Sequence, residues 1–323
     1  MSVQTSTPAF FTKFIGAKGT RQRRLLQDRL TMLAFVSPFL IGLLVFTYYP
    51  IVEGFYLSLF RARGSITNIK FIGLENFRFL LSEQAFIQSL SIFITFTILI
   101  VPTTYALTLG LAVLVNNIKL GSAFFRTVFF LPATVSFVIG ALIWKMTIFN
   151  GLPSSFANQV LGWFGIKPVV WVSMQGGIPW YWLVLVSVRL WLMTGPYFLI
   201  LLAGMQDIPR ELYEAAYMDG AAPGWGTFRH ITLPMLKNMS ISVLLLMTIA
   251  GLMAFAEFYN ILGGQGATGL RQLARPPLLY LYDIGVTGGD YGRSSAGSII
   301  MMVVIFIFTF IQIRVFGLGQ KRY

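Results

Sequence analysis

The fold of this chain is decided by residues 180–204, WYWLVLVSVRLWLMTGPYFLILLAG, an apolar run interrupted by a single charge at Arg189. An α-helix rises 1.5 Å per residue, so about 20 apolar residues span the roughly 30 Å hydrocarbon layer of a bilayer. This run is therefore long enough to cross a membrane as one helix.

Five further stretches of the chain carry no charge, and most consist of Leu, Ile, Val, Phe and Met; they are residues 30–52, 84–118, 127–144, 238–256 and 294–313. A soluble helical core does not explain them, because helices that are apolar on every side leave no face for water. We therefore expect an all-α integral membrane protein with six transmembrane helices, at about 31–50, 86–115, 127–149, 180–204, 238–262 and 295–314.

The composition excludes several classes of function. Of the 323 residues 56% are hydrophobic and 11% are charged, against about 25% charged in a typical soluble domain. The net charge of +13 lies between apolar stretches, which argues against nucleic-acid binding. The chain has no cysteine and one histidine, His230, and no nucleophile motif or paired carboxylates. We therefore expect no enzyme, no catalytic residues and no metal site.

The distribution of Lys and Arg predicts the orientation. With the N-terminus inside, fourteen of these residues fall on the cytoplasmic side and eight on the outer side. The positive-inside rule then places both termini in the cytoplasm. We expect a basic tail at 1–30, a transmembrane domain at 31–316 and a short tail at 317–323. The first apolar stretch is too long for a signal peptide and reads as an uncleaved anchor.

The loop at 205–237, MQDIPRELYEAAYMDGAAPGWGTFRHITLPMLK, is too polar to enter the bilayer. It predicts a helix over 209–220, capped by Asp207, with Pro209 in its first turn and Gly220 as its stop. Such a helix lies on the membrane surface or is buried in another protein. Its alanines and tyrosines favour the second option, because small residues permit close approach and tyrosines are enriched in interfaces.

This loop resembles the EAA signature, EAAxxDGA followed by FxxIxLP, of permease subunits of binding-protein-dependent ABC importers. The matching residues are Glu214, Ala215, Ala216, Asp219, Gly220, Ala221, Phe228, Ile231, Leu233 and Pro234. The stretches SPFLIGLLVFTYYPIVEGFYLSLF, FIGLENFRFLL, LAGMQDIP and YGRSSAGS are similar to the carbohydrate branch, the maltose-type and glycerol-phosphate-type first permeases. The run GGQGATG departs from the TGGGP-like run that is more common there.

The resemblance implies a type I importer permease fold in the bacterial cytoplasmic (inner) membrane, with the EAA loop as a coupling helix for sugar import. It implies a second homologous permease, two copies of an ABC ATPase and an extracytoplasmic solute-binding protein as partners, besides membrane lipid. Glu214 is expected to pair with a basic residue of the ATPase. The chain has no GxxxxGK[ST] phosphate loop, so ATP and Mg are expected in that partner and no cofactor in this chain.

Two questions stay open at the level of the sequence. Arg189 and Glu257, both in apolar stretches, could contact substrate or pair with each other, or be structural. Four further residues could line a sugar pathway or simply pack: Trp191, Tyr197, Tyr259 and Asn260. The alternative functions are an ion-coupled secondary transporter of a small polar solute and a membrane scaffold that transports nothing.

Overall fold

The structure, a computed structural model, describes residues 21–67, 69–118, 120–173, 177–222, 224–263 and 274–316. It divides into two compact units, residues 1–56 and 57–323. The predicted C-terminal tail and most of the predicted N-terminal tail lie outside the described residues.

The first unit is helical from residue 21 onward. It contains α2 (Arg21–Leu43), a π-helical turn η1 (Leu44–Tyr48) and most of α3 (Tyr49–Ser58). Together these form one candidate membrane span, Asp28–Ser58, which is longer than the stretch 31–50 expected from the sequence.

The second unit contains three more helices that are long and apolar enough to cross a membrane: α5 (Gln84–Asn116), α9 (Tyr181–Gln206) and α17 (Tyr291–Phe316). Two further pairs of helices, each bent at a short break, are also long and apolar enough to cross a membrane when each pair is taken as one span. The described residues therefore hold four candidate spans, or six with the bent pairs, which agrees with the expected all-α membrane fold of six spans.

The third expected span, 127–149, is broken rather than straight. Residues Ser122–Thr134 and Phe137–Ile148 meet at an angle of 95°. They comprise α6 (Ser122–Phe130), the 3₁₀ turn η2 (Leu131–Thr134), α7 (Phe137–Ile143) and the π-helical η3 (Trp144–Ile148). Pro132 opens η2, and the Ser136 hydroxyl accepts a hydrogen bond from the Ile139 N–H, so one helix ends and another is capped within a few residues.

The fifth expected span, 238–262, is also divided. It consists of α13 (Lys237–Leu252) and α14 (Ala256–Leu262), separated by three non-helical residues. At its other end α13 meets the segment Trp225–Met235 at 70°.

The core of the second unit lies mainly between α5 and α9, where large side chains are fully buried, among them Phe96, Phe198 and Phe258. A second cluster joins α5 and α17 to α4 (Glu75–Ser82) and α16 (Pro277–Tyr282) through Leu80, Phe86, Tyr280 and Met301. The long helices of the second unit therefore form one packed body.

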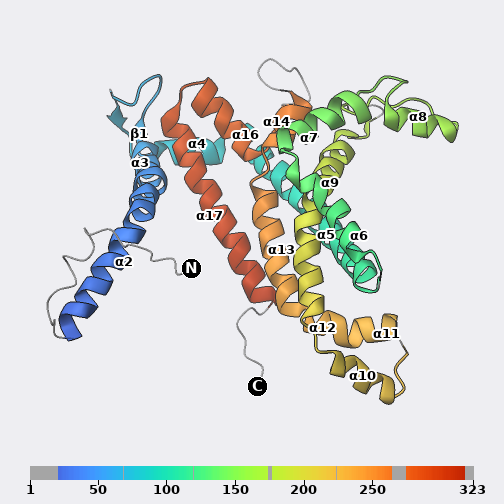
Figure 1. Cartoon of the computed structure of the whole chain (residues 1–323). Helices are drawn as coiled ribbons and strands as arrows, with labels where there is room; N and C mark the ends of the chain where they lie inside the picture. Colours follow the sequence, from blue (N-terminus) through green and yellow to red (C-terminus); the bar gives the residue numbers. More distant parts are fainter. Residues whose placement is uncertain are drawn as a thin grey trace, which may run out of the picture. The chain divides into compact units, whose positions relative to one another are not determined.

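Short elements occupy the two ends of this body (Figure 1). At one end lie α4, α14, α16 and α8 (Phe156–Trp163). At the other end lie α10 (Arg210–Met218), α11 (Trp225–Thr227) and α12 (Leu233–Met235), with the π-helical η5 (Phe228–Thr232) between the last two. The remaining elements are the antiparallel pair β1 (Phe60–Arg61) and β2 (Lys70–Phe71), with Phe60 opposite Phe71, and η6 (Asp283–Thr287).

Gly195 sets the distance between α9 and α6. A Cβ atom there would lie 2.5 Å from the Phe129 carbonyl oxygen and 2.8 Å from the Phe130 Cα, both backbone atoms that cannot turn aside. We expect Gly195→Ala to destabilise the domain by about 1–3 kcal/mol through overpacking. Gly110→Ala, in α5 with nothing within 4 Å of the added Cβ, is the matched control and should be neutral or slightly stabilising. Thermal unfolding of both variants in detergent measures the difference, and equal midpoints would contradict the close approach.

Candidate functional site

Helix α10 is built by signals at both of its ends. Pro209 is the residue before its first turn, and Glu211 lies within that turn, where a carboxylate complements the helix dipole. Asp207 does not cap α10, as the sequence suggested; it closes α9, and its N–H donates to the Ala203 carbonyl at 3.1 Å. Helix α9 continues up to Asp207. The N-cap position of α10 is Pro209, two residues later, so Asp207 cannot cap that helix.

The C-terminus of α10 explains the DGA part of the signature. Gly220 has a φ of +88°, a left-handed conformation that favours glycine. The Gly220 N–H donates to the Tyr217 carbonyl at 3.1 Å, and the Ala221 N–H donates to the Ala216 carbonyl at 2.9 Å. This pair of bonds is the Schellman motif, which satisfies carbonyls that a helix end leaves free. Gly220 therefore acts as the predicted stop.

The segment that carries the second half of the signature is bonded to α10. The Tyr213 hydroxyl and the Thr232 hydroxyl are 2.8 Å apart and share a hydrogen bond. Phe228 and Ile231, on η5, are half-buried, whereas Leu233 and Pro234 are exposed in the turn that leads into α13. Helix α10 is thus linked to the segment Trp225–Met235, which leads into the start of α13.

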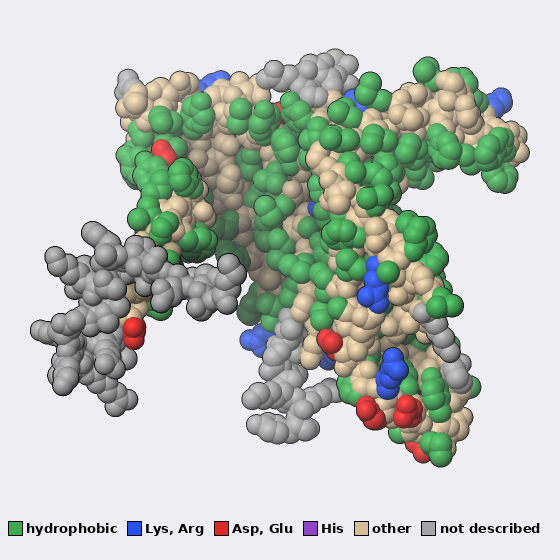
Figure 2. All heavy atoms as spheres, in the orientation of Figure 1, with side chains coloured by type: hydrophobic (Ala, Val, Ile, Leu, Met, Phe, Trp, Pro, Cys, Tyr) green, Lys and Arg blue, Asp and Glu red, His purple; other side chains and the backbone are tan. Residues whose placement is uncertain are grey.

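The outer surface of this unit combines carboxylates with large apolar side chains. Figure 2 shows acidic side chains gathered at the end of the molecule that α10 occupies. Glu211, Glu214 and Asp219 are exposed, and none of them forms an ion pair within the described part of the chain. The exposed apolar side chains beside them include Met218 and Trp225, 88% and 72% exposed. This end of the body therefore exposes both carboxylates and large apolar side chains.

Arg189 and Glu257 form a buried ion pair. The Arg189 guanidinium, on α9, donates to the Glu257 carboxylate, in the first turn of α14, and the two side chains are 8% and 1% exposed. The other guanidinium nitrogen donates to the carbonyl of Ala250, near the end of α13. Arg189 thus bridges the break between α13 and α14, which explains how a broken helix is tolerated inside an apolar body.

Two aromatic rings cover the same guanidinium. Its central carbon lies 5.1 Å from the Phe137 ring centroid and 5.9 Å from that of Phe96, on α7 and α5. Cation–π contacts of this kind favour a cation that has lost its water. The sequence offered no signal for Phe96, Phe137 or Ala250, because each lies in a uniformly apolar stretch.

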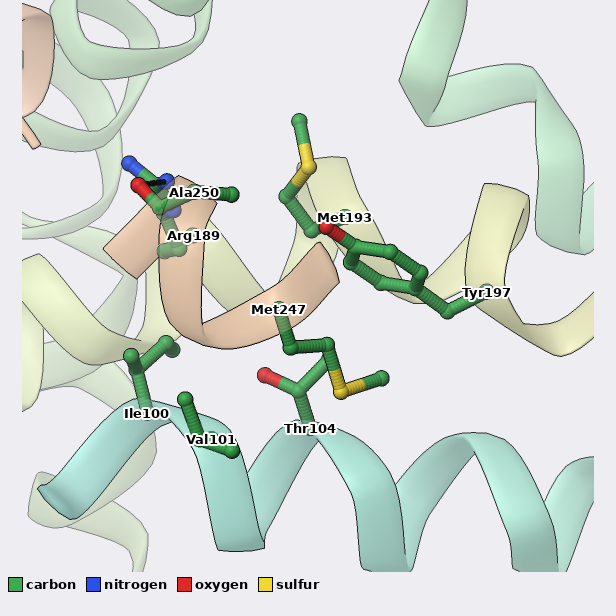
Figure 3. Close-up of a pocket in the computed structure, with 8 residues that line it drawn as sticks. All are labelled: Ile100, Val101, Thr104, Arg189, Met193, Tyr197, Met247 and Ala250. Carbon is green, nitrogen blue, oxygen red and sulfur yellow. Dashed lines mark hydrogen bonds between the residues drawn. The ribbon is translucent and has the colours of Figure 1, made fainter. Parts of the chain in front are cut away.

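A small cavity lies beside Arg189 (Figure 3). Its volume of about 10 Å³ is comparable to that needed by one water molecule. The Thr104 hydroxyl lines the cavity and forms no hydrogen bond within the described part of the chain. Tyr197 lines it as well. A sugar ring does not fit, so this region is closed in the present conformation.

The other residues that the sequence suggested for a pathway lie apart from the cavity. Trp191 packs on Trp144, with ring centroids 4.7 Å apart. Tyr259 stacks on Phe255 at 5.5 Å. The Asn260 side chain donates to the Ala256 carbonyl at 2.7 Å. Arg189 therefore pairs with Glu257 and lines the cavity together with Tyr197, whereas Trp191 packs against another aromatic ring.

Comparisons with known proteins identify the family of this chain. Residues 86–316 match the model of the family described as binding-protein-dependent transport system inner membrane component. The chain belongs to this family. It is a permease subunit of an ABC importer, a multi-pass protein of the inner membrane, as its EAA signature predicted.

Relatives of this permease extend over most of its length. It is 31% identical over 289 residues to the arabinooligosaccharides transport system permease protein AraP of Halalkalibacterium halodurans, covering 88% of this chain and 87% of AraP. It is 33% identical over 280 residues to the trehalose/maltose transport system permease protein MalF of Thermococcus litoralis, covering 87% and 91%.

A solved structure has the same fold. It is a bacterial ABC transporter involved in the import of the acidic polysaccharide alginate, with a TM-score of 0.78 and 22% sequence identity, covering 94% of the permease and all of that chain. At this identity the likeness supports the type I importer permease fold alone. The carbohydrate-branch resemblance of the sequence is confirmed by the sugar permeases among the relatives.

Proposed function

We propose that this permease is one half of the membrane pathway of an ATP-driven sugar importer, paired with a second, homologous permease. The observation that carries the proposal is the EAA segment, a folded helix presented at one end of the body with an exposed surface of carboxylates and apolar side chains. Relatives that transport arabinooligosaccharides, trehalose or maltose, and lactose support sugar as the solute class.

In this proposal two ATPase subunits supply the energy, with ATP and Mg bound in those partners. The α10 segment sits in a groove of one ATPase, and Glu214 pairs with a basic residue there. Closure of the two ATPases then moves the transmembrane helices as rigid bodies. In this orientation α10 and both termini lie on the cytoplasmic side. The positive-inside rule supports it, because this side then carries more Lys and Arg than the outer side.

Solute would arrive from an extracytoplasmic binding protein and pass near the break between α13 and α14. The aromatic residues Phe255, Tyr259 and Tyr282 cluster there, with Tyr259 and Tyr282 ring centroids 5.8 Å apart. Flat aromatic faces suit the apolar C–H faces of sugar rings. The Arg189 guanidinium already donates to the Glu257 carboxylate and to the Ala250 carbonyl. Arg189 therefore gives no support for an anionic solute.

Transport by the reconstituted complex tests the proposal. In vesicles that contain both permeases and the ATPase, uptake of labelled sugar should require ATP inside, with the binding protein on the outer side. A protonophore should leave the uptake rate unchanged. Uptake that follows a proton gradient and ignores ATP would instead establish the ion-coupled alternative, and ATP hydrolysis without uptake would favour a scaffold.

A further inference from the structure

The loop that carries α8 has an inverted distribution of polar and apolar side chains. Its polar residues Ser155 and Asn158 are 1% and 2% exposed. Three of its large aromatic residues face outward: Trp163 is 78% exposed, Phe164 75% and Phe156 60%. A loop in water buries the second kind and exposes the first, so this loop is built for apolar surroundings.

The loop is nevertheless firmly folded. The Asn158 side-chain amide donates to the carbonyls of Leu152 and Val169 at 2.9 and 3.1 Å. Its oxygen accepts from the Val169 N–H and from the Trp171 indole, both at 3.0 Å. Asn158 thereby uses both donors and its acceptor inside the loop. The outward position of the aromatic residues is therefore fixed by the structure of the loop.

Trp171 anchors the loop to the body of the second unit. Its ring, 5% exposed, contacts Phe149 at the end of η3 and Trp180 at the start of α9, with centroids 5.0 and 5.7 Å apart. Helix α8 extends sideways from the body, at the end opposite α10 (Figure 1). Figure 2 shows hydrophobic side chains along the edge of α8 that is turned toward the other end of the body, the direction in which the spans run.

The charges of this segment fit a lipid surface. Between Lys145 and Arg189 the sequence has no Asp or Glu, and the charged residue there is Lys167, which is exposed. A lone cation with Trp and Phe is the composition of interfacial helices, in which aromatic rings lie at the headgroup level and the cation meets anionic lipid.

We propose that α8 and the turn after it lie in the membrane interface at the end of the bundle opposite the EAA segment, with Trp163 and Phe164 inserted roughly 5–10 Å into the headgroup and acyl boundary. The lipid surface then supports the loop between the third and fourth spans from below. This proposal does not depend on the solute or on the ATPase.

Site-specific fluorescence can test it, because the chain contains no cysteine, so that an introduced cysteine is the only one in this chain and can be labelled before the other subunits are added. Phe164→Cys and, as a second variant, Ile166→Cys carry a small environment-sensitive fluorophore. Ile166 is 50% exposed and follows Gly165 in the same turn. The control is Met218→Cys on α10, which is equally apolar and 88% exposed. The labelled full chain is then reconstituted with the other subunits in phosphatidylcholine and phosphatidylglycerol vesicles.

Brominated phosphatidylcholine should quench both loop labels at least about twofold more strongly than the label at residue 218, and aqueous iodide should quench them weakly. Iodide quenching without lipid quenching would show that the loop lies in water and would overturn the proposal. Protection from both quenchers would mean that another protein covers the loop, and it would overturn the proposal equally.

Discussion

Replacing Glu257 with glutamine should destabilise the transmembrane domain by about 3–5 kcal/mol, because Arg189 would remain buried without a counter-charge. The guanidinium lies between α5, α7, α9 and the α13–α14 break, and its side chain is 8% exposed, so it cannot reach water without unpacking the core. The midpoint of thermal unfolding in detergent measures the loss.

The control removes both charges. Arg189→Met combined with Glu257→Leu replaces the pair by apolar side chains of similar size, and it should recover part of the lost stability, because no charge stays buried alone although the Ala250 carbonyl loses its donor. A Glu257→Gln variant as stable as the parent would contradict the buried pair. If the double variant folds but no longer supports uptake, the pair also serves the transport cycle, which stability alone would not reveal.

The same contacts explain what the sequence could and could not predict. Apolar runs predicted the helices that are long and apolar enough to cross a membrane, because a lack of charge is a property of the run itself. The break between α13 and α14 had no such local mark. It is accommodated by Arg189, which is 61 residues away from Ala250 in the sequence and donates to its carbonyl. Helical periodicity is a property of short stretches of sequence, so it cannot reveal a contact between residues this far apart in the chain.

The break in the third span was different, because its signals are local. Pro132 and the capping residue Ser136 stand within the stretch that was expected to be one helix. The uncharged run around them nevertheless predicts one continuous helix. Conversely, Gly220 was assigned correctly as a helix stop, since a left-handed residue at a helix end depends on glycine itself.

The EAA segment was predicted more completely than the possible pathway for the same physical reason. Its helix is short, and Pro209 before its start and Gly220 after its end are local signals. The residues of its signature lie close together in the sequence. The pair of Arg189 and Glu257 could be suggested from two intramembrane charges, but its aromatic cover and the neighbouring Thr104 hydroxyl could not. The residues that line the cavity come from α5, α9 and α13, so no single stretch of sequence shows that they lie close together.

Replacing Glu214 with alanine should reduce ATP-driven uptake by roughly ten- to a hundredfold, since a charge-assisted hydrogen bond to the proposed ATPase is worth about 1.5–3 kcal/mol. The side chain is exposed and has no partner ion within the described residues, so the folding of the permease itself should be unchanged. Uptake into vesicles and copurification of the ATPase measure the two consequences of the change.

Glu211→Ala is the matched control, because it removes the same charge one turn earlier on the same exposed helix. Its effect on uptake should be less than about threefold, since an exposed ion pair contributes little, about 0.2–1 kcal/mol. An equal loss in both variants would point to the net charge of the surface instead of a specific pair. Unchanged uptake in Glu214→Ala would remove α10 as the point through which ATP hydrolysis moves the transmembrane helices.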